Sequence, residues 1–425
     1  MEIIIVAIFV IGYAAIVFEH TIKVNKASSA LITGMLCWTV YILTQTDKET
    51  VSHQLLEHLG DLSGILFFLM GAMTIVELVD AHDGFQVVTQ RIKTKNKRKL
   101  LWILSVVTFF LSAVLDNLTT TIVMLSLLRK MVDNRNDRLL FAGMMVIAAN
   151  AGGAWSPIGD VTTTMLWIGN QITSFNIITR LFLPSLVCLL VPLLLVSPQI
   201  KGNIQLQLTN DDKEEGKIPS TEFERNVVFT IGIAGLLFVP VFKTITHLPP
   251  FMGILLSLGI VWLLTELIHG DKDEADKGFL SVTYALRKID TPSILFFLGI
   301  LIAISALQSV GVLQLMAGWM AEKIPNDSLT VMLLGFLSSV IDNVPLVAAA
   351  QGMYSLNYYP TDHYFWEFLA YCTGTGGSTF IIGSAAGVAA MGIEKIDFFW
   401  YLKKITLIAI LGYLAGAFVY IALSY

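Results

Sequence analysis

Residues 112–125 read Ser-Ala-Val-Leu-Asp-Asn-Leu-Thr-Thr-Thr-Ile-Val-Met-Leu, which places Asp116-Asn117 and three threonines inside an apolar stretch from 100 to 128. A second apolar stretch, 327–352, is interrupted in the same way by Asp342-Asn343, 226 positions later. A carboxylate at the centre of a bilayer is unfavourable by at least about 2.5 kcal/mol, so such a residue is a functional candidate by default. These two interruptions decide how the rest of the chain is interpreted.

The composition indicates a membrane protein. Of the 425 residues, 55% are apolar and only 14% are charged, and the mean hydropathy is +0.72. Soluble proteins usually carry about 25% charged residues, so a soluble chain of this make-up would expose far more hydrocarbon than it could hide. The composition excludes a soluble enzyme and a disordered regulator, and the isoelectric point of about 5.8 also argues against a nucleic-acid binder.

Long apolar runs predict ten membrane crossings, because a hydrocarbon core of about 30 Å needs roughly 20 apolar residues in a helix. The predicted spans are 1–18, 28–45, 62–81, 139–169, 178–197, 226–243, 250–268, 292–320, 364–393 and 399–424. Basic residues follow the first run and do not precede it, as in a retained helix whose N-terminus lies outside.

The distribution of charge indicates how the two interrupted stretches enter the membrane. Basic residues flank 100–128 on both sides, so the positive-inside rule places both flanks in the cytoplasm and predicts a re-entrant hairpin. The flanks of 327–352 place the second hairpin on the opposite face. Of the 27 Lys and Arg residues, this path leaves four outside, namely Lys48, Arg180, Lys243 and Lys323.

Landmarks recur in one order in the two halves of the chain. The sequence ILFFL occurs at 65–69 and 294–298, followed in each half by an Asp-Asn pair and a Gly-Gly pair. An odd number of crossings per half inverts the second copy, which is typical of secondary transporters with broken helices. We therefore predict an all-α polytopic membrane protein with two inverted repeats, about ten crossings, two opposed re-entrant hairpins and two broken helices. The predicted parts are a first repeat at 1–197 with hairpin 100–128 and broken helix 139–169, a cytoplasmic linker at 198–225, and a second repeat at 226–425 with hairpin 327–352 and broken helix 364–393.

The polar residues of these interruptions form a set of oxygen ligands. Pro157 and the glycines around it break the helix at 139–169 and free backbone carbonyls beside Asp160. Carboxylate, amide, hydroxyl and carbonyl oxygens suit a hard cation. Two facing hairpin tips would bring Asp116 and Asp342 together, and neighbouring buried acids cannot all be ionised without a cation. A proton and a metal cation that occupy one group in turn are the chemistry of an antiporter. The candidate ion- and proton-binding residues are Asp116, Asn117, Thr119, Thr120, Ser156, Asp160, Asp342, Asn343, Ser378 and Glu77.

Structural roles are open alternatives for each of these features. An Asp-Asn pair can cap the helix that follows it, and Asp160 can do the same. The glycine loops can serve close helix packing. Glu77 lies near the predicted end of a span, where its carboxylate can reach the interface.

Several motifs resemble the NhaD-type sodium/proton antiporters of the ion transporter superfamily, which also includes arsenite transporters and divalent-anion symporters. The matching segments are SAVLDNLTTTIVML (112–125), GGAWSPIGDVTTTMLW (152–167), SSVIDNVP (338–345) and GTGGSTFIIGSAAG (374–387). Symporters of the superfamily carry Ser-Asn-Thr at the hairpin tips, where this chain has Asp-Asn. A titratable ligand in place of a neutral one fits proton coupling. The second tip, Asn-Val-Pro, lacks the threonines of the first, so the two halves need not be equivalent.

The resemblance implies exchange of cytoplasmic Na⁺ or Li⁺ for external H⁺ by alternating access, in a homodimer with a scaffold and a moving transport domain. Among the candidate residues, we expect Na⁺ ligands at Asp116, Asn117, Ser156, Asp342 and Asn343. We expect a bacterial inner membrane with both termini outside, a role in pH homeostasis, and neither a resident cofactor nor a nucleic-acid partner.

Two other classes of function are weighed against this one. An anion or arsenite carrier on the same scaffold would need cationic or amide donors, and we expect no Lys or Arg near either tip. A membrane enzyme is disfavoured, because no His at membrane depth could serve a Ser nucleophile and no H-E-x-x-H motif or P-loop lysine occurs.

Overall fold

The structure is a computed structural model. It describes residues 2–89, 92, 94–132, 134–203, 220–270, 272, 278–324, 326–340 and 342–424. Most of the predicted linker 198–225 lies outside the described residues, as do Arg91 and Lys93 of the basic run. The regular structure of the described residues is helical, apart from one isolated bridge between Asn96 and Asn203. The predicted all-α class is confirmed.

Seven helical segments among the described residues are long and apolar enough to cross a membrane. They are Lys26–Thr44, Lys48–Ala81, Ser174–Gln199, Glu222–Thr246, Pro250–Ile268, Thr291–Ser309 and Phe398–Ser424. The prediction of a multi-pass membrane protein is therefore confirmed. The other predicted spans correspond to a shorter N-terminal helix of 16 residues and to two helices that are divided near their middle.

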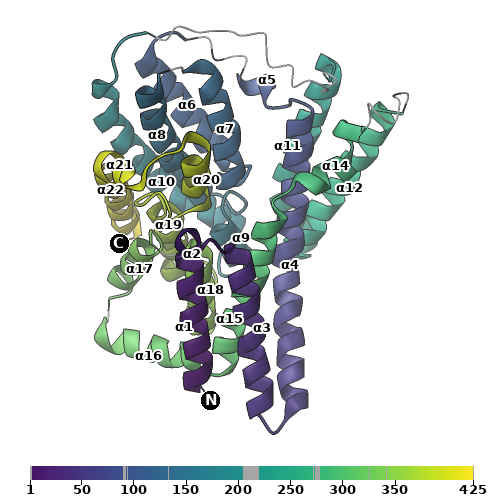
Figure 1. The fold of residues 1–425 in the computed structure, drawn as a ribbon, viewed down its shortest axis with the longest axis vertical. Helices are drawn as coiled ribbons and strands as arrows, with labels where there is room; N and C mark the ends of the chain where they lie inside the picture. The colour runs from purple at the N-terminus through teal and green to yellow at the C-terminus, as the bar shows by residue number, and fades with distance from the viewer. Residues whose placement is uncertain are drawn as a thin grey trace.

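The helices form two groups that pack side by side (Figure 1). The first group, here called the first bundle, contains α1 (Glu2–Val17), α3 (Lys26–Thr44), α4 (Lys48–Ala81), α11 (Glu222–Thr246), α12 (Pro250–Ile268), α14 (Val282–Lys288) and α15 (Thr291–Ser309). Within it α3 packs along α15, and α4 packs on α11, α12 and α15. The 34-residue helix α4 runs along much of the molecule, whereas α1 and α3 meet near mid-height at the short α2 (Glu19–Ile22).

The second bundle contains the broken helices and the segments that carry the Asp-Asn pairs. Its helices are α6 (Lys97–Ser112), α7 (Asn117–Met131), α8 (Arg135–Ala154), α9 (Val161–Ile168), α10 (Ser174–Val196), α17 (Asp327–Leu337), α18 (Asn343–Met353), α19 (Tyr364–Gly376), α20 (Ala385–Glu394), α21 (Phe398–Tyr401) and α22 (Leu407–Ser424). A five-residue π-helical segment, Leu402–Thr406, joins α21 to α22. Contacts of α18 with α15 and of α9 with α4 join this bundle to the first.

Two predicted spans have different bounds in the structure. The run predicted at 292–320 is divided, because α15 ends at Ser309 and Gly311, with φ 84°, starts a separate helix α16 (Val312–Lys323) that lies across the others (Figure 1). The span predicted to begin at 62 begins at Lys48, where the Asp47 side chain accepts the Thr50 N–H and caps α4. Apolar content alone marks neither a left-handed glycine nor a polar first turn.

Glycines let the broken helices lie directly against the backbone of their neighbours. A Cβ at Gly159 would stand 2.6 Å from the Ser112 carbonyl oxygen, and one at Gly383 would collide with the Ser339 carbonyl. Gly159 precedes α9 and Ser112 ends α6, while Gly383 and Ser339 stand at the matching points near α20 and α17. Close packing, one of the open alternatives for these loops, is therefore one of their roles.

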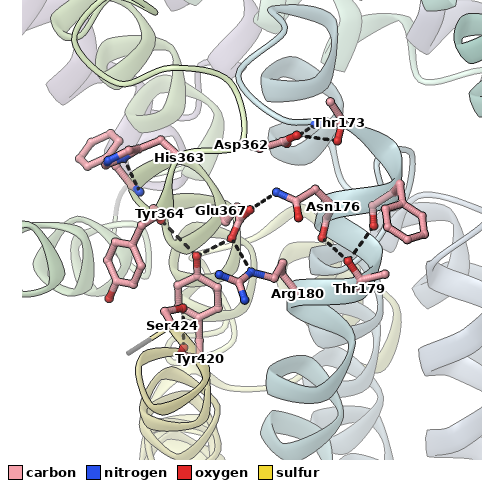
Figure 2. A network of polar contacts seen from close by, with 12 residues as sticks. Thr173, Asn176, Thr179, Arg180, Asp362, His363, Tyr364, Glu367, Tyr420 and Ser424 are labelled. Carbon is pink, nitrogen blue, oxygen red and sulfur yellow. Dashed lines mark hydrogen bonds and ion pairs between the residues drawn. The ribbon is translucent and has the colours of Figure 1, made fainter.

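A buried carboxylate in α19 ties three helices of the second bundle together (Figure 2). Glu367, 1% exposed, accepts hydrogen bonds from Asn176 of α10 and from the Tyr420 hydroxyl of α22, the latter at 2.6 Å. The Arg180 guanidinium lies 3.6 Å from the same carboxylate. Nearby, Asp362 accepts the backbone N–H and the hydroxyl of Thr173. Because its charge is paired and its oxygens are bonded, Glu367 is a structural tie.

A second structural tie holds the end of α20. Glu394, 4% exposed, is paired with Arg129 of α7 at 2.7 Å and with Arg138 of α8 at 2.8 Å. The Arg129 guanidinium also donates to the Ile393 carbonyl. Glu367 and Glu394 therefore anchor helices of the second bundle, Glu367 inside the predicted span 364–393 and Glu394 directly after it.

Candidate ion-binding site

A small cavity lies between the two bundles and gathers three aspartates. The second bundle contributes Asp116, Asn117, Leu118, Asp160, Val161, Asp342, Asn343, Val344 and Ala385 to its wall, and the first bundle contributes Lys26, Met73, Ser293 and Phe297. A neighbouring, largely apolar cavity shares Asp116 and Asp160. Residues that are more than 200 positions apart in the chain thus face one space.

Each of the three aspartates stands at the N-terminus of a helix. Asp116 precedes α7, Asp160 precedes α9 and Asp342 precedes α18, and each accepts a backbone N–H of the first turn. The positive end of a helix dipole stabilises a carboxylate at this position. The capping role that the sequence left open is therefore real. A carboxylate has about four acceptor positions, so a cap leaves oxygen lone pairs for a cation.

Asp116 is held by a single neighbour. Its two carboxylate oxygens accept the backbone N–H of Thr119 at 2.8 Å and the Thr119 hydroxyl at 2.6 Å. This geometry fixes the rotamer of Asp116, and it requires a hydroxyl donor at the third residue after the acid. Among the residues that the structure describes, no lysine or arginine pairs with Asp116.

Asp160 lies deeper and is held by an amide. It is 1% exposed and accepts a 2.5 Å hydrogen bond from the Asn117 side-chain amide. The Thr162 backbone and hydroxyl donate to its other oxygen at 2.8 and 2.6 Å. The same Asn117 amide group donates to the side-chain oxygen of Asn150, Oδ1, at 3.1 Å. Asn117 thus connects the tip before α7 to both parts of the broken helix α8–α9.

Asn150 carries this network into the other half of the chain. It is fully buried in α8, and its amide nitrogen donates at 2.9 Å to the hydroxyls of both Ser378 and Ser384. Ser384 caps α20, in the position that Asp160 occupies before α9. The two broken helices therefore meet through one asparagine, with an acid on one side and two hydroxyls on the other.

Asp342 has a charged partner. The Lys26 ammonium lies 3.4 Å from one of its carboxylate oxygens, and the backbone N–H of Val344 donates to the other oxygen at 3.2 Å. Lys26 is the first residue of α3, in the first bundle. The ammonium also stands 4.4 Å from the centre of the Phe296 ring, at a distance typical of a cation–π contact.

The structure brings half of the predicted candidates to the cavity wall and places the others apart from it. Asp116, Asn117, Asp160, Asp342 and Asn343 line the cavity. Thr119 is hydrogen-bonded to the cavity residue Asp116, and Ser378 is linked through Asn150 to the cavity residue Asn117.

Thr120, Ser156 and Glu77 are not among the residues that line the cavity. Thr120 is fully buried, and the Ser156 hydroxyl accepts the backbone N–H of Ile158 at 3.4 Å. Glu77 lies in α4, four residues beyond the cavity residue Met73.

Three residues of the site were missed by the sequence analysis. The expectation that no Lys or Arg lies near either tip is wrong, because Lys26 contacts Asp342 from a helix 316 positions away in the sequence. Asn150 and Ser384 are absent from the candidate residues predicted from the sequence. Asn150 had a signal, an amide two residues before Gly152-Gly153 inside an apolar helix, but Lys26 had none, because a lysine after a span reads as a topology signal.

The arrangement suits reversible binding of a small hard cation. Carboxylate and amide side chains line this small space together with apolar residues, and the attraction between an ion and a carboxylate is stronger there than in water. Each carboxylate stands at the N-terminus of a helix, so its negative charge is stabilised by the helix dipole and by hydrogen bonds.

Comparison with known proteins gives one consistent assignment. The family described as citrate transporter matches residues 13–366. Sodium/proton antiporter 1 of Arabidopsis thaliana is 49% identical over 415 residues, which cover 98% of this chain and 71% of the relative. Sodium/proton antiporter 2 of the same plant is 45% identical, with 98% of each chain covered. The Na(+)/H(+) antiporter NhaD of Vibrio cholerae is 30% identical, with 98% of this chain and 91% of the relative covered.

Broken helices that bring acids into the interior of a multi-pass bundle define a membrane transporter, and not an enzyme. More narrowly, the chain belongs to the citrate transporter family and, within it, to the NhaD-type sodium/proton antiporters. The resemblance seen in the motifs is thereby confirmed.

Proposed function

We propose that this protein is a secondary active transporter that exchanges Na⁺ or Li⁺ for H⁺. The observation that carries the proposal is the cavity between the two bundles whose wall includes Asp116, Asp160 and Asp342. Acids that share one closed space repel one another when all are ionised, so they take up cations, and a proton and a metal ion compete for them. Relatives that span nearly all of this chain are named sodium/proton antiporters.

The Asp116 side of the cavity is the proposed position of the exchanged ion. Asp116 and Asp160 supply carboxylate oxygens, and Asn117 supplies an amide oxygen. Asp342 and Asn343 face them across the cavity. Ser156, another predicted ligand, does not line the cavity, so it would need a change of local structure to reach the ion.

We propose inverted repeats for the architecture. In both halves two helices flank an Asp-Asn pair, a divided helix follows, and a long apolar helix comes next. α6, α7, α8, α9 and α10 have this order in the first half, as α17, α18, α19, α20 and α22 do in the second. This order supports the predicted ten crossings with two re-entrant hairpins, the repeat boundaries at 1–197 and 226–425, and alternating access.

A homodimer in a bacterial inner membrane with both termini outside is part of the same proposal. The few Lys and Arg residues on the predicted outer side support the orientation. Exposed apolar side chains on α11 and α12, among them Phe238, Val241, Leu256 and Leu263, support contact with lipid or with a second subunit. Cysteine accessibility at the termini and cross-linking in membranes test these two points.

The function is tested in inverted membrane vesicles that hold an imposed pH gradient. Na⁺, Li⁺, K⁺ and arsenite are added in turn, and the pH gradient is followed with a fluorescent probe. We expect Na⁺ or Li⁺ to dissipate the gradient. Vesicles that respond to neither cation contradict the proposal, and transport of arsenite by the same vesicles would favour an anion carrier on this scaffold.

A further inference from the structure

Lys26 is the one charged group that the first bundle contributes to the cavity wall among the described residues. It starts α3, a helix that packs along α15 and α1, whereas its partner Asp342 starts α18 in the second bundle. The ion pair therefore joins the two bundles across the proposed ion site. The side chains of Lys26 and Asp342 are 27% and 21% exposed, so the pair is largely shielded from solvent.

An ammonium at this position needs compensation. The N-terminus of a helix is the positive end of its dipole, so a lysine as the first residue of α3 is disfavoured there. It is also removed in large part from water, which further disfavours its charged form. The Asp342 carboxylate, 3.4 Å away, offsets both the unfavourable helix dipole and the loss of hydration of the ammonium, and the Phe296 ring adds a cation–π contact.

Other acids surround Lys26 at greater depth or on its outer side. Its backbone N–H donates to the Glu19 carboxylate at 3.0 Å, and a second cavity beside it is lined by Glu19 and Asp290. Lys26 thus lies between an outer acidic cavity and the central one.

The two Asp-Asn tips differ in what neutralises them. Asp116 and Asp160 are held by hydroxyl, amide and backbone donors, which carry no formal charge. Asp342 is held by a backbone N–H and by the Lys26 ammonium. A carboxylate that already has a covalently tethered cation as its partner has less need for a mobile one.

We infer that Lys26 is a built-in cation that neutralises the Asp342 tip, so that the Asp116 tip alone takes the exchanged ion. This inference rests on the proposed exchange function and deepens it, because it sets how many mobile cations the cavity attracts. With Lys26 the cavity wall carries three carboxylates and one ammonium, and without Lys26 it carries three carboxylates.

If Lys26 acts through its charge, the apparent affinity for Na⁺ depends on the net charge of the cavity wall, which a merely structural contact would not cause. Replacement of Lys26 by glutamine removes a positive charge from the cavity wall, so the apparent affinity for Na⁺ should rise by about tenfold. Lys26→Arg keeps the charge and should keep the affinity. In the double variant Lys26→Gln with Asp342→Asn, one charge of each sign is lost, so the affinity should return to the wild-type value.

The experiment measures exchange in inverted vesicles as a function of Na⁺ concentration for these variants and for Lys23→Gln. Lys23 is an exposed lysine three residues away and serves as the matched control. A higher affinity in Lys26→Gln that is reversed in the double variant supports the inference. An unchanged affinity overturns it, and so does a loss of affinity that the double variant shares, because the pair is then only a structural tie. Wild-type vesicles that ignore Na⁺ and Li⁺ overturn the exchange function itself.

Discussion

The two Asp-Asn tips are alike in sequence and differ in their surroundings. Asp116 and Asp342 both cap a helix and both line the central cavity. Around the first tip stand a second acid, Asp160, and uncharged donors, whereas around the second stand Lys26 and, in the position that corresponds to Asp160, Ser384. One motif therefore gives a side of the cavity with excess negative charge and a side that is neutralised.

This difference explains how a chain with two Asp-Asn motifs would have the one ion site proposed above. Matching backbones place two acids at the cavity, and the residues that meet those acids from other helices decide which one needs a mobile cation. If only the Asp116 tip takes the exchanged ion, variants at the first tip should disturb exchange most, and variants away from both tips should disturb it least.

The largest effect is expected for Asp116→Asn. An asparagine can still accept the Thr119 N–H and cap α7, so the fold should persist while the titratable charge is lost. Na⁺-driven exchange in inverted vesicles should fall by at least about 100-fold. Asp61→Asn, at an exposed acid in α4, is the control and should exchange normally. Normal exchange in Asp116→Asn would remove the first tip from the mechanism.

The next effect is expected for Asp160→Ser, which gives the first half the residue that the second half has. Serine can cap α9 as Ser384 caps α20, so the change removes a charge and spares the helix start. The Na⁺ concentration for half-maximal exchange should rise by about tenfold or more. If the affinity stays at the wild-type value, excess charge is not what distinguishes the two tips.

A smaller effect is expected for Asn150→Ala, which cuts the link between the two broken helices. The Ser378 and Ser384 hydroxyls lose their buried donor, and each unsatisfied group is unfavourable by about 1–3 kcal/mol. The detergent-solubilised variant should melt at a lower temperature and bind Na⁺ more weakly. Ser378→Ala removes one of these bonds and should lower the melting temperature less. The opposite ranking would show that the link is not centred on Asn150.

Glu77→Gln tests whether the ion site is confined to the cavity between the two tips. Glu77 was a candidate from sequence, but the structure places it one turn beyond Met73 and not on the cavity wall. Exchange should stay within about twofold of wild type. A loss as large as that of Asp116→Asn would show that the site extends along α4 beyond the two tips.

The smallest effect is a loss of stability at acid pH that involves His82. It must be known before a pH profile of exchange is interpreted. The Nδ1 of His82, just after α4, donates to the Leu78 carbonyl at 2.7 Å, so its Nε2 accepts from His269, 2.8 Å away. Burial lowers the pKa of His82. The unfolded chain therefore binds a proton more readily than the folded one does, and this contribution to stability is complete above the ordinary His pKa of about 6.5 and is lost as pH falls below it.

The measurement for this last prediction is the melting temperature of the solubilised protein over a range of pH. It should fall by a few degrees between about pH 7.5 and 5.5 in the wild type, and by less in His82→Gln. The exposed His53 provides the control variant, His53→Gln, which should behave as wild type does. A His82→Gln profile that equals the wild-type profile would show that other groups set the acid limit of the fold.

The sequence by itself determined the membrane class, the helical fold and the positions at which helices break. These follow from local properties, because about 20 apolar residues suffice for a span and a polar pair with glycines or proline ends one. It also singled out the five candidate residues that line the cavity, because acids and amides are rare inside apolar runs. They are Asp116, Asn117, Asp160, Asp342 and Asn343.

The tertiary structure alone decided which of these residues meet and what neutralises them. Lys26 comes to Asp342 from 316 positions away, and Asn150 comes to Ser384 from 234 positions away. Such contacts depend on how helices pack, and no pattern along the chain encodes them at short range. The difference in charge between the surroundings of the two Asp-Asn pairs is therefore a property of the packed bundle.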